Sequence, residues 1–234
     1  MVFNGPWDWG EAFQSMSGFS YRPDVDGLRT LAVIPVILFH AGASWLPGGF
    51  VGVDVFFVIS GYLISSIIIR DVQEGKFSFL HFYERRVRRI IPALLVVLAF
   101  SVSLFQVIAL PDQSKKAAES AMAALLSVSN FYFWHSSGYF SPAAELMPLL
   151  HTWSLGVEEQ FYFLFPILLI MIFRWRLPIR ATLSVAAILS FGVGLWLSVN
   201  KPSFAYYLLP ARAWELLVGV LPPRFPGPGF PGFV

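Results

Sequence analysis

The sequence lacks cysteine and is poor in charge. Without cysteine, the chain can form no disulfide, no thiolate zinc site and no cysteine nucleophile. Only 13% of its 234 residues are charged, whereas 56% are hydrophobic and Phe alone occurs 24 times. A soluble domain of this length needs more charge to cover its surface, so the composition predicts a membrane protein.

Several hydrophobic runs approach the ~20 residues that a helix needs to cross a bilayer. Clear runs cover 28–46, 50–69, 91–110, 157–173 and 181–199, a weaker run covers 117–134, and a seventh begins at 211. The predicted fold class is therefore all-α, a polytopic bundle of about six or seven transmembrane helices.

The two ends of the chain differ from this membrane part. We expect an N-terminal polar segment at 1–20, a membrane domain at 21–221 and an aberrant tail at 222–234. The tail is so rich in Pro and Gly that it cannot continue the helix that begins at 211. We expect that the chain was cut short, or its reading frame altered, inside a larger membrane domain.

The distribution of Lys and Arg predicts the orientation in the membrane. Basic residues gather in the loops 70–90 and 174–180, which should therefore both be cytoplasmic. Strict alternation of all the predicted spans puts the second loop outside. Either the run 117–134 is re-entrant, or the charge rule fails at one loop.

Arg29 and His40 are charged or ionisable groups within the first hydrophobic run. Eleven residues at about 100° each return to nearly the same helix face, so the two side chains share one side. Alone, Arg29 is explained as an anchor whose side chain reaches the interface, and His40 as a histidine hydrogen-bonded to a neighbouring helix. Because the two share a face, a joint functional role is favoured.

Asp54 lies near the start of the next run, after a tight LPGG link at 46–49. Antiparallel neighbouring helices put Asp54 and His40 at similar depth, where a carboxylate can orient an imidazole that acts as a general base. A buried polar contact that fixes the register of the two helices is the equal alternative.

The segment YERRVRR forms a basic cluster. In a helix, Arg85, Arg88 and Arg89 fall on one side with Arg86 beside them. Such a cluster is commonly an anchor to anionic lipid. The alternative is a phosphate clamp, since guanidinium groups bind phosphate oxygens bidentately.

Two further groups of charged residues lie near the later runs. Glu158 and Glu159 are adjacent and so point in different directions from a helix. At least one of them needs a protein partner, unless both simply favour a helix N-terminus. In RAWEL, Arg212 and Glu215 stand three residues apart, close enough for a local ion pair.

Seven motifs, taken in order, resemble the acyltransferase-3 family, bacterial membrane O-acyltransferases that modify extracytoplasmic polysaccharides. They are YRPDVDGLRTLAV, the ten residues between Arg29 and His40, GGFVGVDVFFVISGYLI, FYERRVRRIIPAL, NFYFW with SGYF, LLHTWSLGVEEQFY and RAWEL. By analogy the resemblance, which covers 20–220, implies a domain of about ten membrane helices in the bacterial cytoplasmic membrane.

The resemblance also implies a chemistry. Acetyl-CoA is the expected acyl donor on the cytoplasmic side, a carbohydrate hydroxyl is the acceptor on the other, and neither a permanent cofactor nor a metal is expected. The acceptor stays open among O-antigen, peptidoglycan, exopolysaccharide and a small glycoside. HTWSL with NFYFW and SGYF resembles members that also carry an SGNH-type esterase domain, which we do not expect in this chain. No nucleic-acid partner is expected.

The same resemblance assigns roles to residues. His40 matches the essential histidine and Arg29 its paired basic residue. The Arg-x-x-Arg motif matches either Arg85 with Arg88 or Arg86 with Arg89. The candidate catalytic residues are His40, Asp54 and Glu158, the candidate donor-binding residues are Arg29, Arg85, Arg86, Arg88 and Arg89, and the acceptor-site or structural candidates are Tyr132, Trp153, Glu159, Arg212 and Glu215.

The residues leave three functional classes open. As an acyltransferase, the protein uses His40 as a general base on the sugar hydroxyl, which we favour, or as a nucleophile that carries the acyl group. As a transporter of sugar or ions, it needs no acyl donor. As an inactive truncated fragment, it does neither.

Overall fold

The computed structural model of the protein describes residues 23–73, 77–136 and 147–221. The regular structure in these ranges is helical, without strands, which confirms the predicted all-α class. The predicted segments 1–20 and 222–234 lie outside the described residues. Contacts divide the chain into two compact units, residues 1–52 and 53–234, and each is described by itself.

In the first unit, helix α2 (Pro23–His40) ends earlier than the predicted run 28–46. Gly42 adopts a φ of 82°, a left-handed conformation that glycine tolerates without steric cost. The amides of Gly42 and Ala43 donate back to carbonyls in the last turn, at 3.1 and 3.0 Å, in the pattern that commonly closes a helix. His40 is therefore the last residue of α2.

The chain then turns back through the 3-10 helix η1 (Gly49–Val51). Gly49 and Gly52 lie so close to α2 that a Cβ atom on either would collide with an α2 carbonyl. The rings of Phe39 and Phe50 meet edge to face, with centroids 5.5 Å apart. The tight link predicted from LPGG is confirmed, and glycine makes it possible.

In the second unit, helices α3 (Gly52–Gln73) and α10 (Leu209–Val220) cross closely. A Cβ atom on Gly61 would collide with the backbone of Leu216, and one on Gly219 would collide with the backbone of α3. Small residues allow such close approach between membrane helices. Gly61 therefore allows the close crossing of α3 and α10.

Replacing Gly61 by valine should destabilise the protein by about 1–3 kcal/mol, because the new side chain meets backbone atoms that cannot rotate away. The matched control is Gly192→Val, where a Cβ atom meets nothing within 4 Å. Thermal unfolding of the purified protein in detergent measures the difference. Equal midpoints for the two variants would contradict the close crossing.

Helix α4 (Phe79–Ile108) is longer than the predicted span 91–110, and its first three turns carry the basic cluster that was expected in a loop. Phe82, only 2% exposed, packs into the hydrophobic core and holds these turns to the rest of the unit. The Arg cluster is therefore helical, as its predicted sidedness requires.

The prediction of one continuous, weaker span at 117–134 is wrong. The structure divides this region into α5 (Pro111–Leu125) and α6 (Ser129–Ser136), with Ser127 between them at a φ of 57°. α5 is rich in charge on its exposed side, where Lys116 pairs with Asp112 at 2.8 Å. Neither helix joins the four that are long and apolar enough to cross a membrane, among the residues described.

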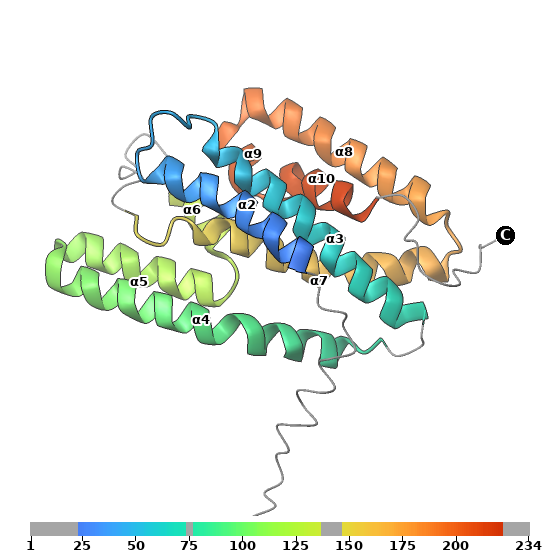
Figure 1. The fold of residues 1–234 in the computed structure, drawn as a ribbon, viewed down its shortest axis with the longest axis horizontal. Helices are drawn as coiled ribbons and strands as arrows, with labels where there is room; N and C mark the ends of the chain where they lie inside the picture. The colour runs from blue at the N-terminus through green and yellow to red at the C-terminus, as the bar shows by residue number, and fades with distance from the viewer. Residues whose placement is uncertain (1–22, 74–76, 137–146, 222–234) are drawn as a thin grey trace, which may run out of the picture. The chain divides into compact units, whose positions relative to one another are not determined.

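Those four helices support a multi-pass membrane protein and bear on the predicted conflict over orientation. They are the candidate spans Gly49–Ile68, Phe79–Ile108, Thr152–Ile172 and Ile179–Asn200. The start of α4 and the connection 175–178 fall on the same side of the second unit, as they must if the chain crosses the membrane only at these four helices (Figure 1). Both basic regions then satisfy the charge rule, which predicts that this side is cytoplasmic.

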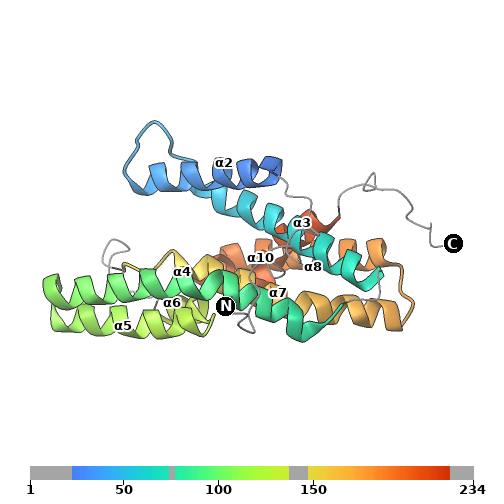
Figure 2. The same cartoon turned by 60° about the horizontal axis from the view of Figure 1, so that its bottom comes forward.

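Helix α7 (Thr152–Arg174) forms much of the core of the second unit. It has the largest buried share of the four spans, and α6, α8 (Ile179–Asn200) and α10 pack against it. The short helix α9 (Pro202–Tyr207) joins α8 to α10 (Figure 1), and Figure 2 shows α8 and α10 beside α7. This packing brings the ends of α3, α7, α9 and α10 together. Fully buried α7 side chains are Val157, Tyr162, Phe165, Leu169 and Ile172.

Candidate active site

The predicted pair Arg29 and His40 lies on one unbroken helix, α2. The His40 ring is exposed, and its Nδ1 lies 2.8 Å from the carbonyl oxygen of Val36. A carbonyl oxygen only accepts, so Nδ1 carries the proton in this hydrogen bond. In the neutral ring, Nε2 then presents a lone pair, which is the arrangement that a general base needs.

Asp54 is paired with a residue that sequence spacing could not reveal. Arg212 Nη1 donates to Asp54 Oδ1 at 2.6 Å and to Glu215 Oε1 at 2.8 Å. The predicted ion pair within RAWEL is thus confirmed, and Asp54 joins it from α3. One guanidinium therefore binds two carboxylates. The predicted role of Asp54 in orienting the His40 imidazole stays a prediction.

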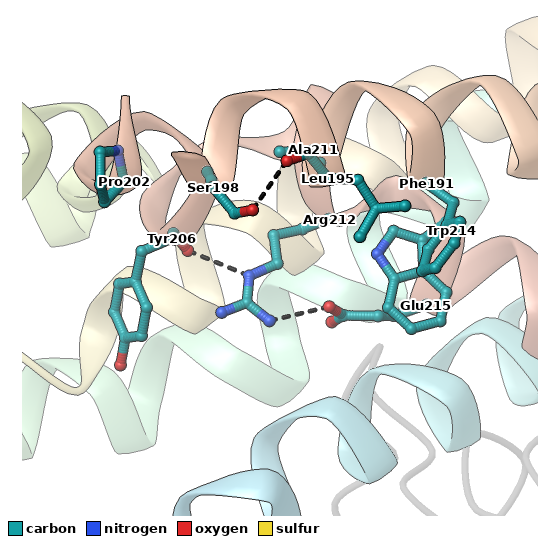
Figure 3. Close-up of a pocket in the computed structure, with 11 residues that line it drawn as sticks. Phe191, Leu195, Ser198, Pro202, Tyr206, Ala211, Arg212, Trp214 and Glu215 are labelled. Atoms are coloured by element: carbon teal, nitrogen blue, oxygen red, sulfur yellow. Dashed lines mark hydrogen bonds and ion pairs between the residues drawn. The ribbon is translucent and has the colours of Figure 1, made fainter. Parts of the chain in front are cut away.

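The surroundings of this cluster are aromatic. The Arg212 guanidinium carbon lies 5.2 Å from the Tyr206 ring centroid and 5.6 Å from that of Trp153. Arg212 Nε also donates to the Tyr206 carbonyl at 3.1 Å (Figure 3). Aromatic faces attract a guanidinium, so both rings help to fix its position. The predicted candidates Trp153, Arg212 and Glu215 therefore belong to one cluster.

A second charged cluster joins α4 to α7. The Arg86 guanidinium carbon lies 4.0 Å from the centroid of the Tyr162 ring, and the Tyr162 hydroxyl donates to Glu158. Glu158 is 7% exposed, so it has the protein partner that its position required. Oε1 of Glu159 is buried and has no hydrogen-bond partner among the residues described.

The other three arginines of the basic cluster have different surroundings. Arg85 Nη2 pairs with Asp71 at 3.2 Å, and Arg88 Nη2 pairs with Glu84 at 2.7 Å. Arg85, Arg88 and Arg89 are exposed, whereas Arg86 is half-buried. The structure thus separates Arg86, which faces α7, from three arginines that face outward.

Helix α3 connects the two ends of the second unit. Asp54, near its start, binds Arg212, and Asp71, near its end, binds Arg85. Seventeen residues at 1.5 Å each place these two carboxylates about 25 Å apart along the helix. The Asp54–Arg212–Glu215 cluster and the exposed arginines therefore lie at opposite ends of a span.

Tyr132 lies apart from these clusters, between α5 and α6. Its hydroxyl donates to Glu119 Oε2 at 3.2 Å and to the carbonyl of Lys116 at 3.3 Å. Burial, together with the nearby Glu119 carboxylate, raises the pKa of Tyr132 to about 12. The phenol is therefore protonated at neutral pH and ties the two helices together.

Sequence reasoning missed three contact residues. Asp71 and Tyr162 are the partners of Arg85 and Glu158, and Tyr206 covers Arg212. Only Tyr162 had a local signal, because it follows Glu158 by four residues on one helix. The other two lie on a different helix from the residue that they contact, six residues away for Tyr206 and fourteen for Asp71.

Comparison with known proteins agrees with the motifs. The family model of an acyltransferase domain, Acyl_transf_3, matches residues 22–232. The peptidoglycan O-acetyltransferase OatA of Listeria monocytogenes is 37% identical over 206 residues, 85% of this chain and 33% of that protein. The O-acetyltransferase OatA of Staphylococcus aureus is 39% identical over 207 residues, 86% of this chain and 34% of that protein.

A putative O-acetyltransferase of Staphylococcus aureus is 34% identical over 217 residues, 90% of this chain and 36% of that protein. The chain thus spans about a third of the length of these curated relatives. No solved structure matches it significantly. The family match covers nearly the whole chain, including both charged clusters and the Arg29–His40 helix, and on this ground the chain belongs to the acyltransferase-3 family of membrane acyltransferases.

Proposed function

We propose that the protein is a membrane O-acetyltransferase that moves an acetyl group from acetyl-CoA in the cytoplasm to a hydroxyl of a cell-envelope carbohydrate. The observation that carries this proposal is the placement of two different charged clusters at opposite ends of α3. An enzyme whose donor and acceptor lie on opposite sides of a membrane needs such a pair of sites.

The donor side is the exposed part of the basic cluster. Coenzyme A carries phosphate groups, and guanidinium groups bind phosphate oxygens through paired hydrogen bonds. We assign this contact to Arg85, Arg88 and Arg89, which are exposed at the predicted cytoplasmic end. Arg86 lies over the Tyr162 ring, so we assign it the structural role of positioning α7 against α4 and not a contact with the donor.

The chemical step is assigned to His40. Nε2 takes the proton of the acceptor hydroxyl while the hydroxyl oxygen attacks the thioester carbonyl. The carbon–sulfur bond then breaks, the acetyl group stays on the sugar oxygen, and the thiolate of coenzyme A leaves and is protonated. The hydrogen bond from Nδ1 to Val36 supports this role, since it keeps the lone pair on the other nitrogen.

The donor site is tested by replacing Arg85, Arg88 and Arg89 together by glutamine. Because a hydrogen bond to a charged group contributes about 1.5–3 kcal/mol, the Kd for acetyl-CoA should rise at least ~10-fold. The measurement is equilibrium binding of acetyl-CoA to the purified protein.

The matched control is Arg174, Arg176 and Arg180 replaced together by glutamine. These three arginines are also exposed, on the same side of the second unit, and their loss removes the same charge. An equal rise in Kd for both triple variants would indicate a general effect of positive charge. No rise in either would contradict the phosphate clamp.

A further inference from the structure

A cavity of about 310 Å³ opens beside the Asp54–Arg212–Glu215 cluster, between α8, α9 and α10 (Figure 3). Its rim includes the exposed residues Phe191, Leu195 and Ser198 of α8. Pockets that take small ligands begin at about 300 Å³, so the space suits one small ring.

The cavity is mainly apolar and aromatic, with the Ser198 hydroxyl on its rim and a charged pair at one point. Tyr206 and Trp214 contribute rings, and Arg212 and Glu215 contribute the charged pair. Such a lining, with few polar groups among apolar ones, is typical of a site that orients a ligand. A pyranose ring matches it, because its C–H faces are apolar and its edge carries hydroxyls.

The polar groups have unused hydrogen-bonding capacity. Arg212 uses Nε and Nη1 within the protein, and the described residues give its Nη2 no partner. Glu215 is 1% exposed, and its Oε2 is a buried acceptor without a partner in the described part of the chain. A buried acceptor left unpaired costs free energy, which a hydroxyl donor from a ligand recovers.

The position of the cavity agrees with an acceptor. It lies at the end of α8 that is remote from the basic connection 175–178, and next to α9. In the orientation that the basic regions predict, this is the extracytoplasmic end. A carbohydrate of the cell envelope reaches the protein from that side.

We infer that the α8–α9–α10 cavity is the carbohydrate subsite, in which one pyranose ring packs against Tyr206 and Trp214 and hydrogen-bonds to Arg212 and Glu215. This assignment rests on the proposed function, because it names the place where that reaction holds its acceptor. Arg212 and Glu215 bind the sugar here and take no part in the acyl transfer itself.

The test fills the cavity without touching its charged groups. Ser198→Phe introduces a ring from α8, and Ala205→Phe does so from α9. The control Val199→Phe adds the same ring at the next residue, which is 82% exposed and does not line the cavity. The probe is a β-1,4-linked N-acetylglucosamine tetramer, and its binding to the membrane-reconstituted protein is measured without donor.

Both cavity variants should weaken tetramer binding at least tenfold, whereas Val199→Phe should bind the tetramer as the wild type does. All three variants should bind acetyl-CoA with the wild-type Kd. The inference is overturned if the wild-type protein does not bind the tetramer, or if a folded cavity variant binds it as the wild type does. Acetyl transfer is measured separately. A protein that binds the tetramer in this cavity but transfers no acetyl group would contradict the proposed function and leave the subsite standing.

Discussion

Replacing His40 by alanine is expected to reduce acetyl transfer by ~10²–10⁴-fold, the contribution that a well-placed general base makes. The ring hangs from the last residue of α2 and is exposed, so its removal leaves no cavity. Insertion into the membrane and the thermal unfolding midpoint should therefore stay as in the wild type. The measurement is the rate of acetyl transfer from labelled acetyl-CoA to a soluble oligosaccharide.

The matched control is His135→Ala, which removes another exposed histidine from the last turn of a helix, α6. It should retain full activity. A nucleophilic His40 would be revealed by a labelled acetyl group that stays on the protein when no acceptor is present. Wild-type rates in His40→Ala would remove His40 from the mechanism.

Replacing Arg212 by methionine is expected to have the largest effect on stability. The change leaves the carboxylates of Asp54 and Glu215 close together without their shared cation. Removing one partner of a buried ion pair costs about 3–5 kcal/mol, because the remaining charge stays buried and uncompensated. This cost falls mainly on Glu215, whose side chain is 2% exposed, whereas solvent screens much of the charge of Asp54, whose side chain is 35% exposed. Thermal unfolding in detergent should show the loss as a lower midpoint.

A triple variant separates this electrostatic effect from lost packing. Adding Asp54→Asn and Glu215→Gln to Arg212→Met removes both uncompensated charges while the side-chain volumes are kept. Most of the lost stability should return, since neutral replacements of buried ion pairs are often tolerated. If the triple variant were no more stable than Arg212→Met, the carboxylates would not be the source of the cost.

The features that follow from local spacing were predictable from the sequence. Composition and hydrophobic runs identified a helical membrane protein. Arg29 and His40 lie on one face of the same helix because eleven residues are close to three turns. Arg212 meets Glu215 because residues three apart are neighbours on a helix. These relations depend only on helical geometry.

The contacts between helices were not predictable in this way. Asp54 and Arg212 are 158 residues apart, and no pattern in either segment names the other. Likewise, both overlapping Arg pairs fit the Arg-x-x-Arg motif, and only the packing of α4 on α7 shows that Arg86 faces Tyr162. Tertiary packing decided what periodicity left open.

The break between α5 and α6 was missed because neither Gly nor Pro marks it. Buried polar groups hold α6 instead: Ser129 donates to the carbonyl of Thr152 at 2.7 Å, and Asn130 exchanges hydrogen bonds with Gln160. Since a buried amide must be hydrogen-bonded, these contacts outweigh the continuation of one helix. An Asn in a weak hydrophobic run was the available signal.

The lengths of the connections make the two faces of the membrane unequal. On the predicted inner side, α3 joins α4 through 74–78, and α7 joins α8 through 175–178, whereas α5, α6 and α9 all belong to the opposite side. In the described part of the second unit, the connection between α7 and α8 on this side is four residues long, and Arg85, Arg88 and Arg89 on the first turns of α4 are exposed there. A coenzyme A thioester, the donor that we propose, would approach the arginine-bearing turns of α4 from this side. Among the described residues of the second unit, the helices outside the four candidate spans are α5, α6, α9 and α10, and α5, α6 and α9 lie on the opposite side, where a polymer acceptor of the proposed reaction would find its surface.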